Sequence, residues 1–303
     1  MEWLKRVPVV GPAVGWVLRT RAYRVFEHFN DVGSNRMAGA VTFFGFLALF
    51  PLLTVALAVA AALLSDHRTD QLQQKIAEQF PGLSDQLNIH DIANNAGTVG
   101  VISGVILLVS GLGWVDTTRV CIRTSWALPI EPGNVIVRKL WDVGVLIGLG
   151  LVGAVSLGAS TAAGAAANQV AKWIGAGHAG AGRAGLTAAA FVIAVAADLL
   201  VFSYLLTGLP RIFGQRRRVV LEAALMGAVG FELLKQALAA YVAGVATKSV
   251  YGAFGTPIAL LLWINFMCRW LLYCVAWTAT ADPAAARARA RARAREALAK
   301  ADE

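Results

Sequence analysis

The chain has 303 residues, of which 57% are hydrophobic and only 15% are charged. A soluble globular protein would carry about 25% charged residues, so the composition argues against a soluble domain and indicates a surface that largely faces lipid. The formal net charge of +9 would suit nucleic acid, but basic residues beside anionic lipid headgroups explain it more simply.

The first predicted element is an amphipathic helix within residues 13–29. Its apolar residues recur at roughly helical spacing with arginines between them: Val14, Val17, Leu18, Val25 and Phe29, with Arg19, Arg21 and Arg24. Such a helix can lie in the plane of the headgroups. We favour this interfacial position over the alternative, a solvated helix docked on the rest of the protein.

Six later segments are apolar enough to cross a bilayer, which takes about 20 predominantly apolar residues. They cover residues 38–64, 97–115, 143–167, 184–209, 219–246 and 252–281. Lipid does not tolerate open irregular backbone, and no segment alternates like a barrel strand, so all six are expected to be helices. The predicted fold is therefore all-α, a polytopic bundle of six transmembrane helices.

Lysine and arginine are distributed unevenly over the connections. The two tails and the connections on the same side hold 20 of the 27 Lys and Arg residues, and the other connections hold 5. Because basic residues accumulate in the cytoplasm, both termini are predicted there, which requires an even number of spans. The predicted layout is a cytoplasmic segment at 1–37, a transmembrane domain at 38–281 and an Arg/Ala-rich cytoplasmic tail at 282–303.

Two extramembrane segments stand out. The outer connection at 65–96 is long enough to lie over the bundle, as a lid or as a cover. In the tail, arginine and alanine alternate from Arg287 to Arg295, which suits contact with anionic lipid. RNA binding is the weaker alternative, because no aromatic residues interleave to stack on bases.

Four charged residues lie inside the apolar segments: Asp198, Glu232, Lys235 and Arg269. A charge near the bilayer centre costs about 2.5–3.5 kcal/mol on insertion scales, so it usually has a partner or a function. Asp198 and Arg269 fall at the same depth, about 16 Å from one end of their helices at 1.5 Å per residue. Glu232 and Lys235 are three residues apart on one helix face. We predict the pairs Asp198–Arg269 and Glu232–Lys235, in a functional cluster or as structural pins.

A basic rim is predicted on the cytoplasmic side after the fourth span, formed by Arg211, Arg216, Arg217 and Arg218. The sequence shows no catalytic or cofactor motif. The cysteines Cys121, Cys268 and Cys274 form no disulfide or metal pattern, and no phosphate loop, nucleophile elbow or metalloprotease motif is present. We therefore expect no enzymatic activity, no metal and no cofactor.

Several stretches carry a family resemblance: Met37 to Leu57, with its Leu-Phe-Pro-Leu core; Leu209 to Phe213; Phe231 to Val242; and Val250 to Phe266. They resemble the YihY/BrkB family of bacterial inner-membrane proteins, formerly labelled ribonuclease BN. Glu232 and Lys235 match the family's Trp-Glu-Leu-Leu-Lys motif, and Phe231 replaces its Trp. The family tends to close the sixth span with a Gly-Ala-Glu-type sequence, where this chain has Trp277, Thr278 and Ala279. The resemblance implies six helices with both ends inside and residence in the bacterial inner membrane.

The central charges and the basic rim suit transport or handling of a lipid or other anionic amphiphile at the cell envelope. The resemblance points the same way. The alternative is a non-transporting envelope scaffold or assembly factor, and the missing catalytic residues argue against a ribonuclease. The expected partners are membrane lipids, through anionic headgroups at the cytoplasmic face, without nucleic acid. The sequence points to no particular protein partner.

Overall fold

The computed structural model describes residues 20–63, 96–129, 134–151, 180–212, 215–245, 255–281 and 291. Every regular element within these ranges is a helix, as predicted for the all-α class. The helices are α2 (Arg21–Asp31), α3 (Ser34–Leu63), α6 (Ala96–Ser125), α8 (Gly180–Thr207), α9 (Arg217–Val245), α10 (Gly255–Ala279) and a further helix at 135–151. The outer connection at 65–96 and most of the Arg/Ala tail lie outside the described residues.

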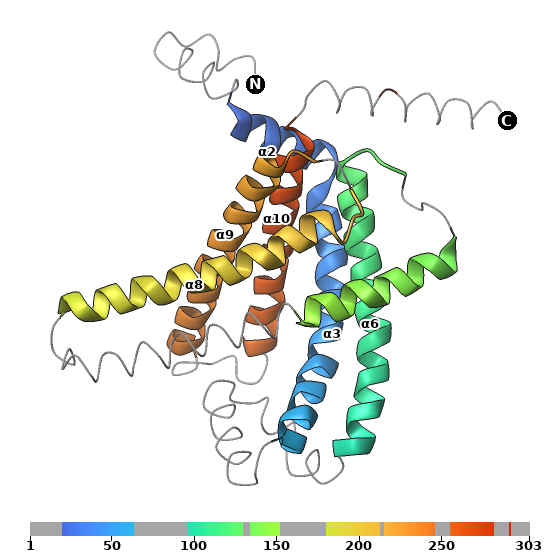
Figure 1. Ribbon diagram of the computed structural model, residues 1–303, viewed down its shortest axis with the longest axis vertical. Coiled ribbons are helices and arrows are strands. Elements are labelled where there is room, and N and C mark those ends of the chain that lie inside the picture. The colour runs from blue at the N-terminus through green and yellow to red at the C-terminus, as the bar shows by residue number, and fades with distance from the viewer. Residues whose placement is uncertain are drawn as a thin grey trace.

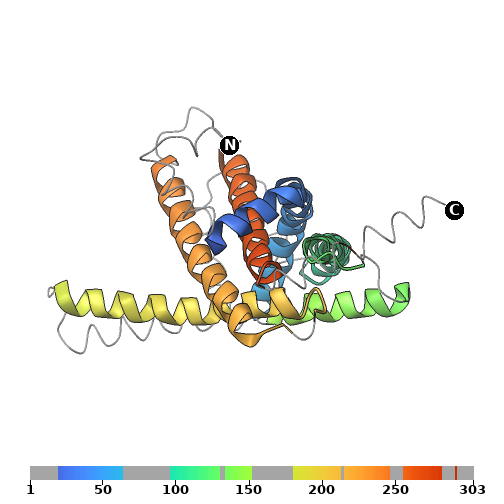
Figure 2. The same cartoon turned by 90° about the horizontal axis from the view of Figure 1, so that it is seen from above.

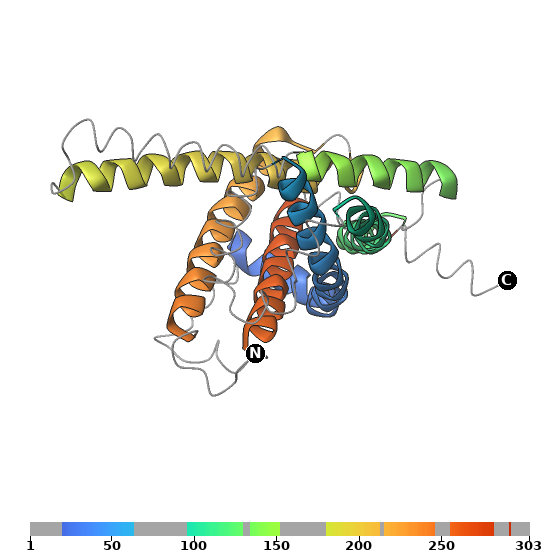
Figure 3. The same ribbon diagram turned by 90° about the horizontal axis from the view of Figure 1, so that it is seen from below.

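Four helices run side by side, and two cross them. α3 packs on α6 and α10, and α10 packs on α9. α8 and the 135–151 helix lie along one side of these four, cross them, and point away in opposite directions (Figures 1, 2 and 3). The crossing pair meet where the Tyr204 hydroxyl donates to the carbonyl of Val145 at 3.4 Å.

Among the helices that the structure describes, three contain a segment long and apolar enough to cross a membrane: Ser34–Val55 in α3, Gly100–Ser125 in α6 and Pro257–Ala279 in α10. α8 has a shorter apolar stretch, Phe191–Thr207. Large apolar side chains such as Phe43, Val101 and Val109 are more than half exposed, which suits a surface in contact with lipid. The number of crossings and the side on which the termini lie stay predictions.

The segments predicted to share one side of the membrane do gather at one end of the molecule, called here the basic end. α2 lies across the end of α10 (Figure 1). His28 Nε2 donates to the carbonyl of Ser125 at 2.9 Å, which joins α2 to the end of α6. Arg123 Nη1 donates to the carbonyl of Pro210 at 2.8 Å, which adds the turn after α8.

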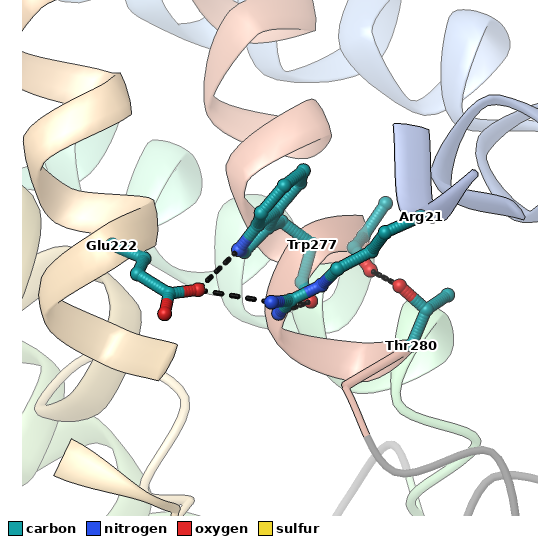
Figure 4. Close-up of polar contacts among 5 residues, drawn as sticks. Arg21, Glu222, Trp277 and Thr280 are labelled. Atoms are coloured by element: carbon teal, nitrogen blue, oxygen red, sulfur yellow. Dashed lines mark hydrogen bonds and ion pairs between the residues drawn. The ribbon is translucent and has the colours of Figure 1, made fainter. Parts of the chain in front are cut away.

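A polar contact at this end ties α2 to α9 and α10 (Figure 4). Glu222 Oε2 accepts from Arg21 Nη1 at 2.9 Å and from Trp277 Nε1 at 3.2 Å. The Arg21 guanidinium also lies 4.1 Å from the centre of the Trp277 ring. Thr280, drawn beside them, donates to its own helix, to the carbonyl of Ala276. These contacts hold the ends of α2, α9 and α10 together.

The α2 helix begins at Arg21, where the Thr20 hydroxyl caps it by accepting from the Tyr23 amide. Val25 and Phe29 are buried, and the Phe29 ring stacks on Tyr273 with centroids 3.9 Å apart. These two apolar residues therefore face protein, as in the docked alternative. Val14, Val17 and Leu18 lie outside the described residues, and a position at headgroup depth stays a prediction.

Close approach of α9 to its neighbours depends on two glycines. A Cβ at Gly227 would overlap the Phe202 ring of α8, and a Cβ at Gly230 would overlap the Trp270 indole of α10. Trp270 is fixed there because its Nε1 donates to the carbonyl of Met226 at 3.1 Å. The indole thus occupies the space that a side chain at position 230 would need.

Gly230→Ala is therefore expected to destabilise the protein, because overpacking typically costs about 1–3 kcal/mol. Gly39→Ala is the matched control, since nothing lies within 4 Å of a Cβ placed there and both glycines are inside helices. The thermal midpoints of the two purified variants in detergent provide the measurement. A Gly230→Ala midpoint at or above that of Gly39→Ala would contradict this packing.

Candidate functional site

The charges within the helices form a triad of Asp198, Glu232 and Lys235. Lys235 Nζ lies 2.6 Å from Glu232 Oε1, one turn before it on α9, and 3.0 Å from Asp198 Oδ2 on α8. It also lies 4.6 Å from the centre of the Phe231 ring. Both carboxylates are buried, Asp198 at 3% and Glu232 at 7% exposure. The predicted Glu232–Lys235 pair is confirmed, and one ammonium serves both acids.

The predicted Asp198–Arg269 pair is wrong. Asp198 bonds Lys235, and the side chain of Arg269 makes no ion pair or hydrogen bond with any residue that the structure describes. The position of each residue along its helix predicted that both lie at the same depth in the membrane. It did not predict the direction in which each side chain points. The four charges therefore separate into a triad and a single arginine.

Arg269 is exposed and instead lines an open cavity of about 580 Å³. The cavity lies between α9 and α10 and reaches the first turn of α3. Its lining residues are Asn35, Met226, Val229, Gly230, Leu233, Leu234, Phe266, Arg269, Trp270 and Tyr273. Arg269 is the single charged residue among them, and most of the others are apolar. Glu232 and Lys235 are not among the lining residues, although both lie next to Leu233 and Leu234 in the sequence.

The four arginines of the predicted basic rim also lie in two different environments. Arg216, Arg217 and Arg218 are exposed at the start of α9. Arg211 is partly buried in the turn after α8, has a φ of +53°, and lies 4.9 Å from the centre of the Trp141 ring. An arginine in this left-handed region is uncommon and marks a position where the surrounding structure fixes the backbone.

A buried charge network at the end of α6 was missed by the sequence analysis. Arg119 is 2% exposed and Asp142, on the 135–151 helix, is fully buried. Arg119 donates to Asp142 through Nη1 and to Asp116 through Nη2. The predicted second span ended at Val115, which placed Arg119 in a loop, whereas α6 continues to Ser125. The three-residue spacing of Asp116 and Arg119 was the available signal for this continuation.

Comparison with known proteins decides the family. A family model described as Virulence factor BrkB matches residues 25–298. The chain belongs to this family. The BrkB match spans nearly the whole chain and includes the triad, the cavity and the network at Arg119.

The BrkB-family chain is similar to several bacterial proteins. It is 33% identical to an uncharacterized protein of Dickeya dadantii (strain 3937) over 90% of this chain and 88% of that protein. It is 26% identical to the inner membrane protein YhjD of Escherichia coli (strain K12), over 93% and 84%. A UPF0761 membrane protein of Verminephrobacter eiseniae (strain EF01-2) is 30% identical, over 87% of this chain and 62% of that protein. No solved structure matches.

With its apolar helices and these relatives, the protein is an integral protein of the bacterial inner membrane.

Proposed function

We propose that this BrkB-family protein binds and handles an anionic amphiphile, a membrane phospholipid, in the cavity between α9 and α10. The single observation that carries the proposal is the placement of Arg269. It is the single charge among the lining residues of an otherwise largely apolar cavity, and it has no partner among the described residues. No catalytic step, cofactor or nucleic acid is part of the proposal.

The size and chemistry of the cavity support this ligand class. Sites for small molecules usually span about 300–1,000 Å³ and combine apolar walls with a few polar groups that set orientation. A guanidinium is the side chain best suited to a phosphate, because it offers parallel N–H donors in a fork. Val229, Leu233 and Phe266 would take the acyl chains, each methylene of which contributes about 0.8 kcal/mol when buried.

The triad has a structural role in this proposal. Its ammonium already bonds two carboxylates, and it is not among the groups that line the cavity. Asp198, Glu232 and Lys235 would fix α8 against α9, and so hold one wall of the cavity in place. The bound lipid would contact Arg269 instead.

Bound phospholipid in the purified full-length protein tests the proposal. Arg269→Gln should lower the amount of anionic phospholipid that copurifies, measured by native mass spectrometry, by about tenfold, the effect of 1.4 kcal/mol. Leu233→Trp should also lower it, because the indole fills the cavity without a change of charge. Both variants should fold normally, since Arg269 has no partner among the described residues.

Arg24→Gln is the matched control, because Arg24 is exposed on α2 and the substitution removes the same charge. It should retain the wild-type lipid content. If Arg269→Gln and Leu233→Trp keep as much anionic lipid as Arg24→Gln, the cavity is not the binding site. A scaffold role would then be the better account.

A further inference from the structure

Four buried or partly buried arginines meet at the basic end of the molecule, away from the cavity at Arg269. Arg119 and Arg123 lie on the last turns of α6, Arg138 lies on the 135–151 helix, and Arg211 lies in the turn after α8. We call them the arginine cluster. Two carboxylates, Asp116 and Asp142, lie among them in the described part of the chain.

Three of the four arginines have at least one bonded partner, although Nε of Arg119 and both Nε and Nη1 of Arg138 are buried without a hydrogen bond in the described structure. Arg119 bonds both aspartates. Arg123 donates from Nε to the carbonyl of Pro129 at 2.7 Å and from Nη1 to that of Pro210 at 2.8 Å. Arg138 has a partner of its own. These three arginines therefore serve mainly to join α6, the 135–151 helix and the turn after α8.

Arg211 differs from the other three because its guanidinium makes no hydrogen bond or ion pair with any residue that the structure describes. Its Nε and Nη2 atoms are buried without an acceptor in this part of the chain, although buried donors are almost always bonded. Burial lowers the pKa of Arg211, and the charges of Arg119 and Arg138 lower it further, against an opposing effect from Asp142. The neighbouring positive charges therefore favour an additional anion beside this guanidinium, and two of its donors have no acceptor among the described residues.

The surroundings indicate the depth of this site. Arg211 packs on Trp141, a residue that is nearly half exposed. Tryptophan is enriched at the headgroup level of membranes, where one part of the indole is in lipid and the other in water. A position at this level would place Arg211 in the layer where lipid phosphates and dissolved phosphate are both available.

We propose that the arginine cluster is a phosphate-binding site, in which a phosphate group accepts hydrogen bonds from Arg211 Nε and Nη2. Two donors on one guanidinium match two oxygens of a phosphate. A lipid headgroup and free phosphate are the two sources of this group, since both present the same oxygens. This site stands independently of the lipid cavity, because no residue is common to both.

Thermal unfolding of the full-length protein tests the proposal. In neutral detergent, inorganic phosphate should raise the midpoint in a saturable way, above sodium chloride of equal ionic strength. In a second arm, nanodiscs of phosphatidylcholine with and without phosphatidylglycerol are compared. A phosphate effect in detergent without a phosphatidylglycerol effect identifies free phosphate as the ligand, and the reverse identifies the headgroup.

In whichever of the two experiments shows an effect, Arg211→Gln should lower the apparent affinity for the ligand at least tenfold. Arg216→Gln, the same change at an exposed position nearby, should leave that affinity unchanged. If Arg211→Gln does not fold, Arg211→Gly replaces it, because glycine favours the φ of +53° found here. The proposal is overturned if neither arm exceeds its control in the wild-type protein. It is also overturned if the Arg211 variant responds as strongly as Arg216→Gln.

Discussion

Lys235→Leu is expected to remove most of the folded protein from the membrane. The substitution leaves Asp198 and Glu232 buried side by side without the ammonium that lies 3.0 and 2.6 Å from them. Removal of one partner from a buried ion pair costs about 3–5 kcal/mol, and here two acids lose their partner. Fluorescence-detected size exclusion of detergent extracts measures the yield, and the thermal midpoint measures what remains.

A rescue experiment separates loss of charge balance from loss of the lysine itself. The triple variant Asp198→Asn, Glu232→Gln, Lys235→Leu has no uncompensated charge and should recover much of the yield. Arg269→Leu, which changes a charge with no partner in the described part of the chain, should fold like the wild type. If Lys235→Leu alone reaches the wild-type yield and midpoint, the triad does not hold α8 on α9.

Arg119→Leu is expected to destabilise the basic end by a similar amount, about 3–5 kcal/mol. Asp142 is fully buried, and Arg119 bonds one of its oxygens while the other has no hydrogen bond in the described structure. Without the guanidinium, that carboxylate would be buried and unpaired. The thermal midpoint in detergent is the readout, and the loss should be larger than that of Gly230→Ala.

Two further variants test the cause. Arg119→Leu combined with Asp142→Asn should recover much of the loss, because the buried charge is gone. Arg218→Leu removes an exposed arginine and should change the midpoint little, as is usual for surface positions. Equal midpoints for Arg119→Leu and Arg218→Leu would show that the network at Asp142 contributes nothing to stability.

The sequence predicted the local features well because each depends on neighbours along the chain. The Glu232–Lys235 pair follows from a spacing of three residues on one helix, which brings two side chains together whatever surrounds them. The apolar segments predicted the positions of the helices for the same reason. The end of α6 was placed too early, because the charges of Asp116 and Arg119 end the apolar run, and Asp142, which pairs with Arg119, lies 23 residues further along the chain.

The sequence determined that this chain is an all-helical membrane protein with a basic end, through its composition, the length of its hydrophobic runs and the uneven distribution of its basic residues. These quantities depend on the solvent that each segment meets. The tertiary structure alone decided which charges meet. Lys235 rather than Arg269 bonds Asp198, and Arg269 lines a largely apolar cavity. Arg211 has two buried donors without an acceptor among the described residues. The depth of a residue along its helix can be counted from the sequence. The rotation of each helix about its axis and the crossing of α8 over its neighbours are set by packing between segments far apart in the chain.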